Sequence, residues 1–235
     1  MNKLGLKIYL NWLTIRSLFF NYPLRLVRLV FHFLQWIPQI RKQHLPSNGL
    51  VEWIIDFGCY IGDVFIVPDV LEFIYVWIQP KMRLLNNSEK KAAIEYFGDR
   101  VQLRNVRISY KVPRGIMSWA IAFVTFNTIH YSRPISKSVF IHEMVHIWQY
   151  QKFGSVYIYR AIKAQRSIEG YNYGGLENLY SKMLNNYFFT EFNFEQQGEI
   201  FEDYCKLKES GQLTNPIALA SFEYFVGQVR NGKYI

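Results

Sequence analysis

The chain has 235 residues, half of them hydrophobic, with 27 Lys and Arg against 18 Asp and Glu. This composition excludes a disordered chain and allows a substantial buried core. The net charge of +9 is uneven, because the segment before residue 50 is basic and contains no acidic residue. We therefore expect an anionic partner for that segment, such as a lipid surface, and no nucleic-acid partner for the protein as a whole.

The first 40 residues have the pattern of basic amphipathic helices. Leu, Phe, Trp and Ile recur at three- and four-residue spacing over residues 5–40, with basic residues such as Arg16 among them. Pro23 and Pro38 divide this region into two predicted helices. These helices either lie on an anionic membrane surface, using residues 1–45, or pack on the rest of the protein. No signal peptide is expected, since no small-residue cleavage site follows the first apolar run.

Residues 50–79 form a second aromatic-rich block. Five acidic residues exclude this block as a bilayer span, namely Glu52, Asp56, Asp63, Asp69 and Glu72. A packed helical subdomain or an element at a membrane interface is expected instead. With the preceding helices it makes residues 1–85 a basic, aromatic-rich helical extension.

From residue 86 the sequence has the pattern of alternating helices and strands expected of an α+β domain. Ser88 is placed to cap a helix that Gly98 ends in the left-handed conformation. Residues 101–112 have strand composition, and residues 121–131 supply one or two more strands with a turn at 127–128. A helix is then expected to begin near Ser136, which follows Pro134, and to stop at Gly154.

The most informative motif lies within this last helix. Residues 142–146 read His-Glu-Met-Val-His, so two imidazoles are four residues apart and project from one helical face. Both can reach one tetrahedral zinc ion. Glu143 would then lie beside the metal, where a carboxylate that does not bind it can act as the general base of a hydrolase.

A catalytic zinc site needs a third protein ligand. Asn193 is a credible N-cap with Gln196 at the capping-box position, so Glu195 and Glu199 share one face of a second helix. One of these carboxylates can bind the metal while the other accepts the outer N–H of a ligand histidine. Glu195 is the expected ligand, and Asp203 competes for the supporting role.

Other polar residues are candidates for roles in the same site. Tyr171 and Tyr173 lie between the two ligand helices, and Tyr173 is selected as a catalytic residue that would stabilise an oxyanion. His130, on a predicted strand, is expected to be a structural, hydrogen-bonded histidine. Cys59 and Cys205 lack the spacing of metal ligands and are expected to be reduced thiols.

Three segments carry a resemblance to a known family. They are residues 89–108, with Tyr-Phe-Gly-Asp and Val-Arg-Ile, residues 140–151, FIHEMVHIWQYQ, and residues 192–204, FNFEQQGEIFEDY. Over roughly residues 88–205 the chain resembles the bacterial Vgr-related metalloproteases, which are similar to gluzincins and some of which occur with secretion-spike systems. The helical extension lies outside the resemblance.

The resemblance implies a function and a set of site residues. It implies His142, His146 and Glu195 as zinc ligands and Glu143 as the catalytic residue. It also implies supporting roles for Trp148, Gln149, Gln196, Gln197 and Asp203.

The prediction is therefore an α+β, zincin-like metalloprotease domain over residues 86–210. Residues 211–235 are expected to form a C-terminal helical tail that packs on this domain. The protein would be a zinc-dependent peptidase acting on a protein or peptide, with the strands before the motif helix offering an edge for an extended substrate. The alternatives are a non-catalytic, metal-stabilised delivery module of a secretion system and a membrane-acting protein. The expected location is cytoplasmic or peripheral to a membrane, with export by a specialised secretion system as a further alternative.

Overall fold

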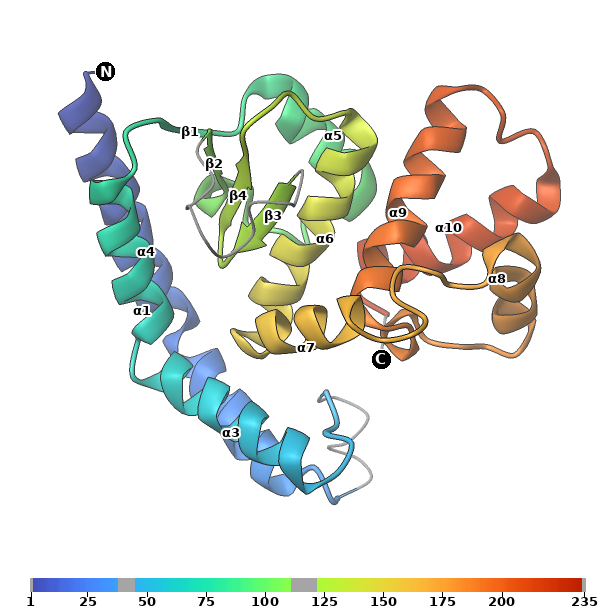
Figure 1. Ribbon diagram of the computed structural model, residues 1–235, viewed down its shortest axis with the longest axis horizontal. Coiled ribbons are helices and arrows are strands. Elements are labelled where there is room, and N and C mark those ends of the chain that lie inside the picture. The colour runs from blue at the N-terminus through green and yellow to red at the C-terminus, as the bar shows by residue number, and fades with distance from the viewer. Residues whose placement is uncertain (1, 38–44, 111–121, 234–235) are drawn as a thin grey trace.

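A computed structural model describes residues 2–37, 45–110 and 122–233. The α-helices are α1 (Lys3–Leu34), α3 (Leu50–Val64), α4 (Val67–Ile78), α5 (Asn87–Phe97), α6 (Lys137–Phe153), α7 (Val156–Gln165), α8 (Gly175–Leu184), α9 (Phe194–Glu209) and α10 (Pro216–Asn231). The strands are β1 (Met82–Leu84), β2 (Arg107–Ser109), β3 (Ala122–Thr125) and β4 (Thr128–Tyr131). The fold is thus α+β with helices predominating, as predicted (Figure 1).

The strands form one small sheet in the order β1-β2-β4-β3. β2 and β4 are parallel, with Ile108 opposite Ile129, whereas β1 and β3 are antiparallel to their neighbours. β3 is an edge strand of this four-stranded sheet. The two-residue turn between β3 and β4 comprises Phe126 and Asn127, one residue earlier than predicted.

The strand predicted over residues 101–112 is much shorter in the structure. Only Arg107–Ser109 pairs with neighbours, and Leu103–Asn105 forms a short 3₁₀ turn instead. Residues 111 and 112 lie outside the described chain. The strand begins only where Arg107 pairs with both adjacent strands, so tertiary pairing overrides local strand propensity.

The capping residues seen in the sequence predict the ends of α6 correctly and those of α5 in part. Ser136 caps α6 through its side chain, and Gly154 follows its last residue, as predicted. The cap of α5 was predicted wrongly, since Asn86 rather than Ser88 accepts the backbone N–H of Glu89 and completes a capping box. Gly98 does end α5, but at φ 58° and ψ −126° it is not in the left-handed helical conformation.

α6 lies between the sheet and α9 and is the central helix of the domain (Figure 1). Its buried residues extend around most of its circumference, as expected for a helix covered on several sides. Trp148 packs against Phe153 and Phe189, and Phe201 of α9 stacks on Phe97 of α5. α10 packs on α5, α8 and α9, which places the C-terminal tail against the domain.

The amino-terminal region differs from the prediction in one respect. α1 is a single helix of 32 residues that continues through Pro23, so the predicted break there is wrong. Pro23 is exposed, and the carbonyl that loses its helical partner can therefore be solvated. The predicted break at Pro38 lies outside the described residues. α3 and α4 run back along α1 (Figure 1), and among the described helices none is long and apolar enough to cross a membrane.

Candidate metal centre

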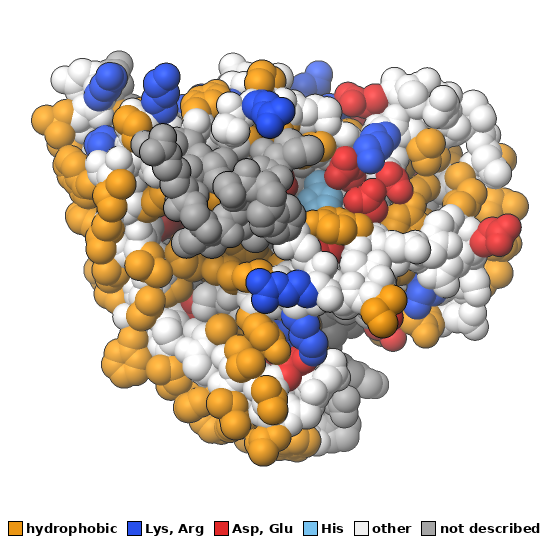
Figure 2. All heavy atoms as spheres, in the orientation of Figure 1, with side chains coloured by type: hydrophobic (Ala, Val, Ile, Leu, Met, Phe, Trp, Pro, Cys, Tyr) orange, Lys and Arg blue, Asp and Glu red, His pale blue; other side chains and the backbone are white. Residues whose placement is uncertain are grey.

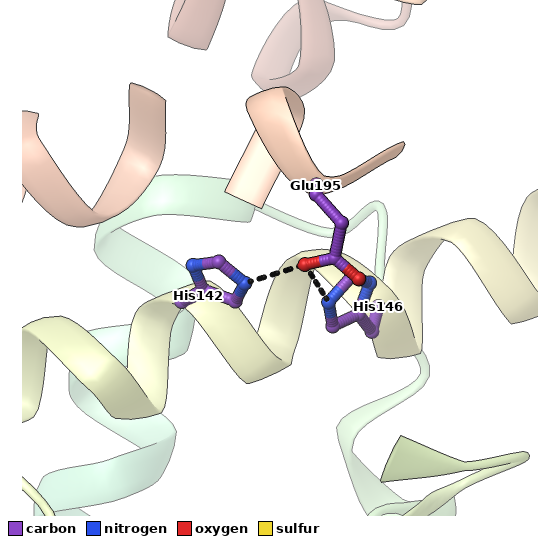
Figure 3. A group of neighbouring side chains, drawn as sticks. All are labelled: His142, His146 and Glu195. Carbon is purple, nitrogen blue, oxygen red and sulfur yellow. Dashed lines mark ion pairs between the residues drawn. The ribbon is translucent and has the colours of Figure 1, made fainter. Parts of the chain in front are cut away.

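Three predicted ligands converge at the face where α6 meets α9. Glu195 Oε2 lies 3.5 Å from His142 Nε2 and 3.6 Å from His146 Nε2. Figure 3 shows the carboxylate reaching from α9 to both imidazoles, which are one turn apart on α6. One donor atom from each residue lies within 4.8 Å of the other two, and all three side chains are buried. These three residues could together hold a metal ion.

The start of α9 fixes the position of Glu195. The Asn193 side chain accepts hydrogen bonds from the backbone N–H groups of Glu195 and Gln196, at 3.0 and 2.8 Å. Gln196 Oε1 in turn accepts from the backbone N–H of Asn193 at 3.0 Å. This is the capping box predicted from the sequence, and it holds the first turn of α9 above α6.

The charges at the site are strongly coupled. Burial opposes the charged form of every group, but the attraction between the carboxylate and the two imidazoles outweighs burial. The pKa of Glu195 is lowered to about 2 and that of His142 is raised to about 10. The surrounding carboxylates stabilise positive charge at this point. A divalent cation could supply that charge in place of the protons on the imidazoles. The donor set, two imidazoles and one carboxylate, is one that zinc accepts.

A hydrogen-bonded chain orients His146. Its Nδ1 lies 2.7 Å from Gln149 Oε1, and the Gln149 amide donates to Phe194 O and Gln197 Oε1, both at 2.9 Å. Gln197 then donates to Phe192 O at 2.8 Å. Gln149 Oε1 can only accept, so Nδ1 must carry the proton and Nε2 is left free for a metal. The supporting roles expected for Gln149 and Gln197 thus have a geometric basis.

The outer nitrogen of His142 faces a carboxylate that the sequence analysis missed. Glu202 Oε2 lies 3.1 Å from His142 Nδ1, although without the alignment of a full hydrogen bond. Glu199, the residue predicted to accept from His142, lies in a group with His142 and Glu202. It is Glu202, however, that lies nearest to His142 Nδ1. Glu195, Glu199 and Glu202 follow i, i+4, i+7 spacing, and this acidic stripe was the available signal.

Glu143 has the environment expected of a general base. Its side chain is buried, and its Oε2 has no hydrogen-bond partner among the described residues. Burial raises its pKa, although the neighbouring His146 and His142 oppose that rise. A buried, unpartnered carboxylate oxygen is costly unless it serves a ligand or a reaction.

A cavity of about 160 Å³ adjoins the three ligands and Glu143. The edge strand β3 forms one wall through residues 122–125, and Tyr157 and Ala161 of α7 form part of another. Tyr157 links α7 to β3, because its hydroxyl donates to Val124 O at 3.0 Å. In Figure 2 a histidine side chain is visible at the surface beside a group of acidic side chains.

The two candidate tyrosines have different positions. Tyr171 lines the cavity, and its hydroxyl accepts a hydrogen bond from Gln165 at 2.6 Å. Burial, together with Glu195, raises the pKa of Tyr171 to about 12. Tyr173 is not among the cavity residues, and its hydroxyl donates to Asp203 at 2.9 Å. The position of Tyr173 does not suit the catalytic role predicted for it, and Tyr171 is the better placed of the pair.

The remaining candidates have structural positions. His130 is fully buried, with Tyr75 Oη 2.9 Å from Nδ1 and Thr125 Oγ1 2.6 Å from Nε2, which confirms a hydrogen-bonded histidine. Cys59 and Cys205 are unpaired thiols, as predicted.

No family model, no curated protein and no solved structure matches the chain. The chemistry of the site therefore rests on its own geometry.

Proposed function

We propose that this protein is a zinc-dependent metallopeptidase with a zincin-like domain. The observation that carries the proposal is the convergence of His142, His146 and Glu195 beside the unpartnered carboxylate of Glu143. Zinc bound by the three ligands would lower the pKa of a coordinated water toward about 7 and polarise a carbonyl. The resemblance of residues 88–205 to the Vgr-related metalloproteases agrees with this set of ligands.

The chain's own residues suit amide hydrolysis. Glu143 is placed to take a proton at its free Oε2 and to return it to a leaving amine. The edge strand β3 forms a wall of the cavity, so an extended peptide could pair with its backbone alongside Glu143. A peptide or protein is therefore the substrate class that the cavity favours. In the cell the enzyme would be cytoplasmic or peripheral to a membrane, or exported by a specialised secretion system.

A purely structural metal site is the main rival. Such a site is closed by a fourth protein ligand, whereas catalytic sites keep one position open. Within the described residues, the group formed by His142, His146 and Glu195 contains three ligands. The adjoining cavity also gives access to that position, which favours turnover over a structural role.

Paired measurements of metal content and hydrolysis test the proposal. The purified full chain should hold about one zinc per molecule and cleave members of a peptide library, and chelation should abolish cleavage reversibly. Glu195→Ala should lose zinc. Glu143→Gln should keep zinc but slow hydrolysis by roughly 10²- to 10⁴-fold. The exposed Glu169→Gln is the matched control and should match the parent in both measurements. Hydrolysis by Glu143→Gln at the parental rate would refute the mechanism.

A further inference from the structure

The three helices described before residue 80, α1, α3 and α4, have an inverted burial pattern. Their acidic residues are the buried ones, with no more than 7% of any side chain exposed: Glu52, Asp56, Asp63, Asp69 and Glu72. Many large hydrophobic residues of these helices and their flanks are exposed instead, and the most exposed, at 70–77%, are Phe19, Phe20, Trp36, Leu50, Val51 and Phe65. Such an arrangement is the reverse of the usual one in water.

Contacts with the domain fix which side of these helices faces inward. Asp56 pairs with Arg160 of α7 at 2.6 Å, and Glu52 pairs with the same arginine. Asp63 accepts the backbone N–H of Ser155 at 3.0 Å, at the junction of α6 and α7. Because buried carboxylates need such partners, the helices cannot rotate to hide their apolar side.

The same is true of α4 and α1. Asp69 accepts from Arg25 Nη2 of α1 at 2.9 Å, and Glu72 accepts the backbone N–H of Asn127 at 3.1 Å. Arg28 of α1 donates to Gln151 O of α6 at 2.6 Å. The buried acidic side chains of α3 and α4 are therefore engaged by the protein itself.

The opposite side, which we call the outer face, consists of the exposed hydrophobic residues of α1, α3 and α4. Most of the exposed large hydrophobic residues in the described parts of the chain belong to it. In Figure 2 hydrophobic side chains follow the left and lower margins of the molecule, where Figure 1 places these helices. An apolar surface of this extent marks a binding surface.

The charges on the outer face are all of one sign. Among residues 2–37 and 45–79, Lys3 is the exposed charged residue, and Lys7 and Arg16 are half-buried. The Arg16 guanidinium lies over the rings of Trp12 and Phe20, at 5.7 and 5.4 Å from their centroids. An apolar face with basic and tryptophan side chains and no accessible carboxylate is typical of helices that lie in the interface of an anionic bilayer.

We propose that the outer face of α1, α3 and α4 inserts into the interfacial region of an anionic phospholipid bilayer, with the helices lying along the membrane. Since no described helix is long and apolar enough to span a bilayer, the attachment is to one leaflet. Anionic headgroups would neutralise Lys3, Lys7 and Arg16, whereas a second copy of the chain would bring more positive charge to the same surface. The proposal does not depend on the metal centre.

Vesicle flotation of the full chain tests this inference. The protein should float with vesicles containing 30% phosphatidylglycerol in phosphatidylcholine, and more weakly with phosphatidylcholine alone. Phe19→Glu/Phe20→Glu should reduce binding at least tenfold. The matched control is Ile168→Glu/Ile217→Glu, which places the same charges on exposed hydrophobic residues outside these helices and should float like the parent.

A charge variant and a depth measurement complete the test. Lys3→Gln/Arg16→Gln should lower the affinity for anionic vesicles by roughly fivefold for each residue removed, without affecting the weaker binding to phosphatidylcholine. Brominated lipids should quench the fluorescence of the parent and quench a Trp12→Phe/Trp36→Phe variant less.

Any of three results would overturn the proposal. The first is failure of the parent to float with anionic vesicles, and the second is flotation of Phe19→Glu/Phe20→Glu at the parental level. The third is a stable dimer in solution that Phe19→Glu/Phe20→Glu converts to monomer while neither protein binds vesicles, because the occupant of the outer face would then be a second copy. Circular dichroism should show that the variant is folded.

Discussion

Gly198 of α9 lies directly against the imidazole of His142. A Cβ atom placed on Gly198 would be 2.6 Å from both Cε1 and Nε2 of that ring, closer than any tolerated contact. The helix backbone therefore forms part of the wall that positions the ligand. Only glycine leaves room for His142 to keep its place beside Glu195.

Gly198→Ala should accordingly displace His142 and lower zinc affinity by roughly 10- to 100-fold, as loss of other supporting contacts does. A competitive chelator titration would measure the change. Gly227→Ala is the matched control, because an added Cβ in α10 would meet only Asn231 Nδ2 at 3.9 Å, and alanine favours helix. Parental zinc affinity in Gly198→Ala would contradict the assigned contact.

Gln149 connects His146 to the backbone of α9. Replacing it therefore separates its effect on zinc binding from its effect on the stability of the fold. Gln149→Leu removes the acceptor for His146 Nδ1 and leaves buried polar groups unpaired, and should weaken zinc binding by roughly 10- to 100-fold and destabilise the fold by about 1–3 kcal/mol. Gln149→Glu keeps an acceptor for His146 but cannot donate to Phe194 O. We expect this second variant to be unstable yet to bind zinc more tightly than the leucine variant, as chelator titration and urea unfolding would show.

The two tyrosines are distinguished by their positions. Tyr171 lines the cavity beside Glu195, and because its hydroxyl accepts from Gln165, that hydroxyl can also donate to an oxyanion formed there. Tyr171→Phe should lower kcat by roughly 10²-fold with zinc retained. Tyr173→Phe, which removes only the hydrogen bond to Asp203, should change kcat less than threefold. Equal losses in the two variants would argue against a direct role for Tyr171.

Glu89 should make stability depend on pH. Burial raises the pKa of Glu89, but Arg83, whose guanidinium nitrogens lie 2.6 and 2.7 Å from its oxygens, and the Asn86 N–H more than reverse this, so the net pKa is lowered. A lowered folded pKa means that the unfolded chain binds more protons in this window. The stabilisation is present above about pH 4.3 and is lost as pH falls through the folded pKa.

Glu89→Gln tests this directly. The variant should be less stable at neutral pH by about 1 kcal/mol, and its free energy of unfolding should fall less steeply than the parent's below pH 5. Urea titrations at several pH values provide the measurement. Glu95→Gln is a useful comparison, because the pKa of Glu95 is also lowered but its partner Lys208 is on the surface. Parallel pH profiles for the parent and Glu89→Gln would contradict the prediction.

The features that depend only on residues close together in the sequence could be predicted from it. The motif helix, its Ser136 cap and the capping box that presents Glu195 are all determined within a few residues, and they were predicted. The pairing of His142 and His146 with Glu195 also followed, because the ligand chemistry demands a third donor. Each of these features is determined either by residues close together in the sequence or by the chemistry of metal ligands.

The missed features depend on contacts between elements. Gly198 and Glu202 face His142 only because α9 packs on α6 in one register, which the sequence does not specify locally. Pro23 predicted a helix end, but its exposed position lets α1 continue. The acidic residues of residues 50–79 correctly excluded a span, yet only the fold shows that they point inward and leave the hydrophobic residues outside.

The hydrogen bond from Asn127 to Glu72 joins parts of the chain that the sequence pattern separates at residue 85. Asn127 belongs to the turn that connects β3 to β4, and β3 is a wall of the cavity. Arg107 in β2 likewise donates to Leu10 O of α1 at 2.7 Å. A fragment that starts at residue 86 would therefore expose the underside of the sheet and loosen the strand on which a substrate would lie. The first helices therefore support the edge strand that we propose binds peptide, and the proposed activity should be measured on the whole chain.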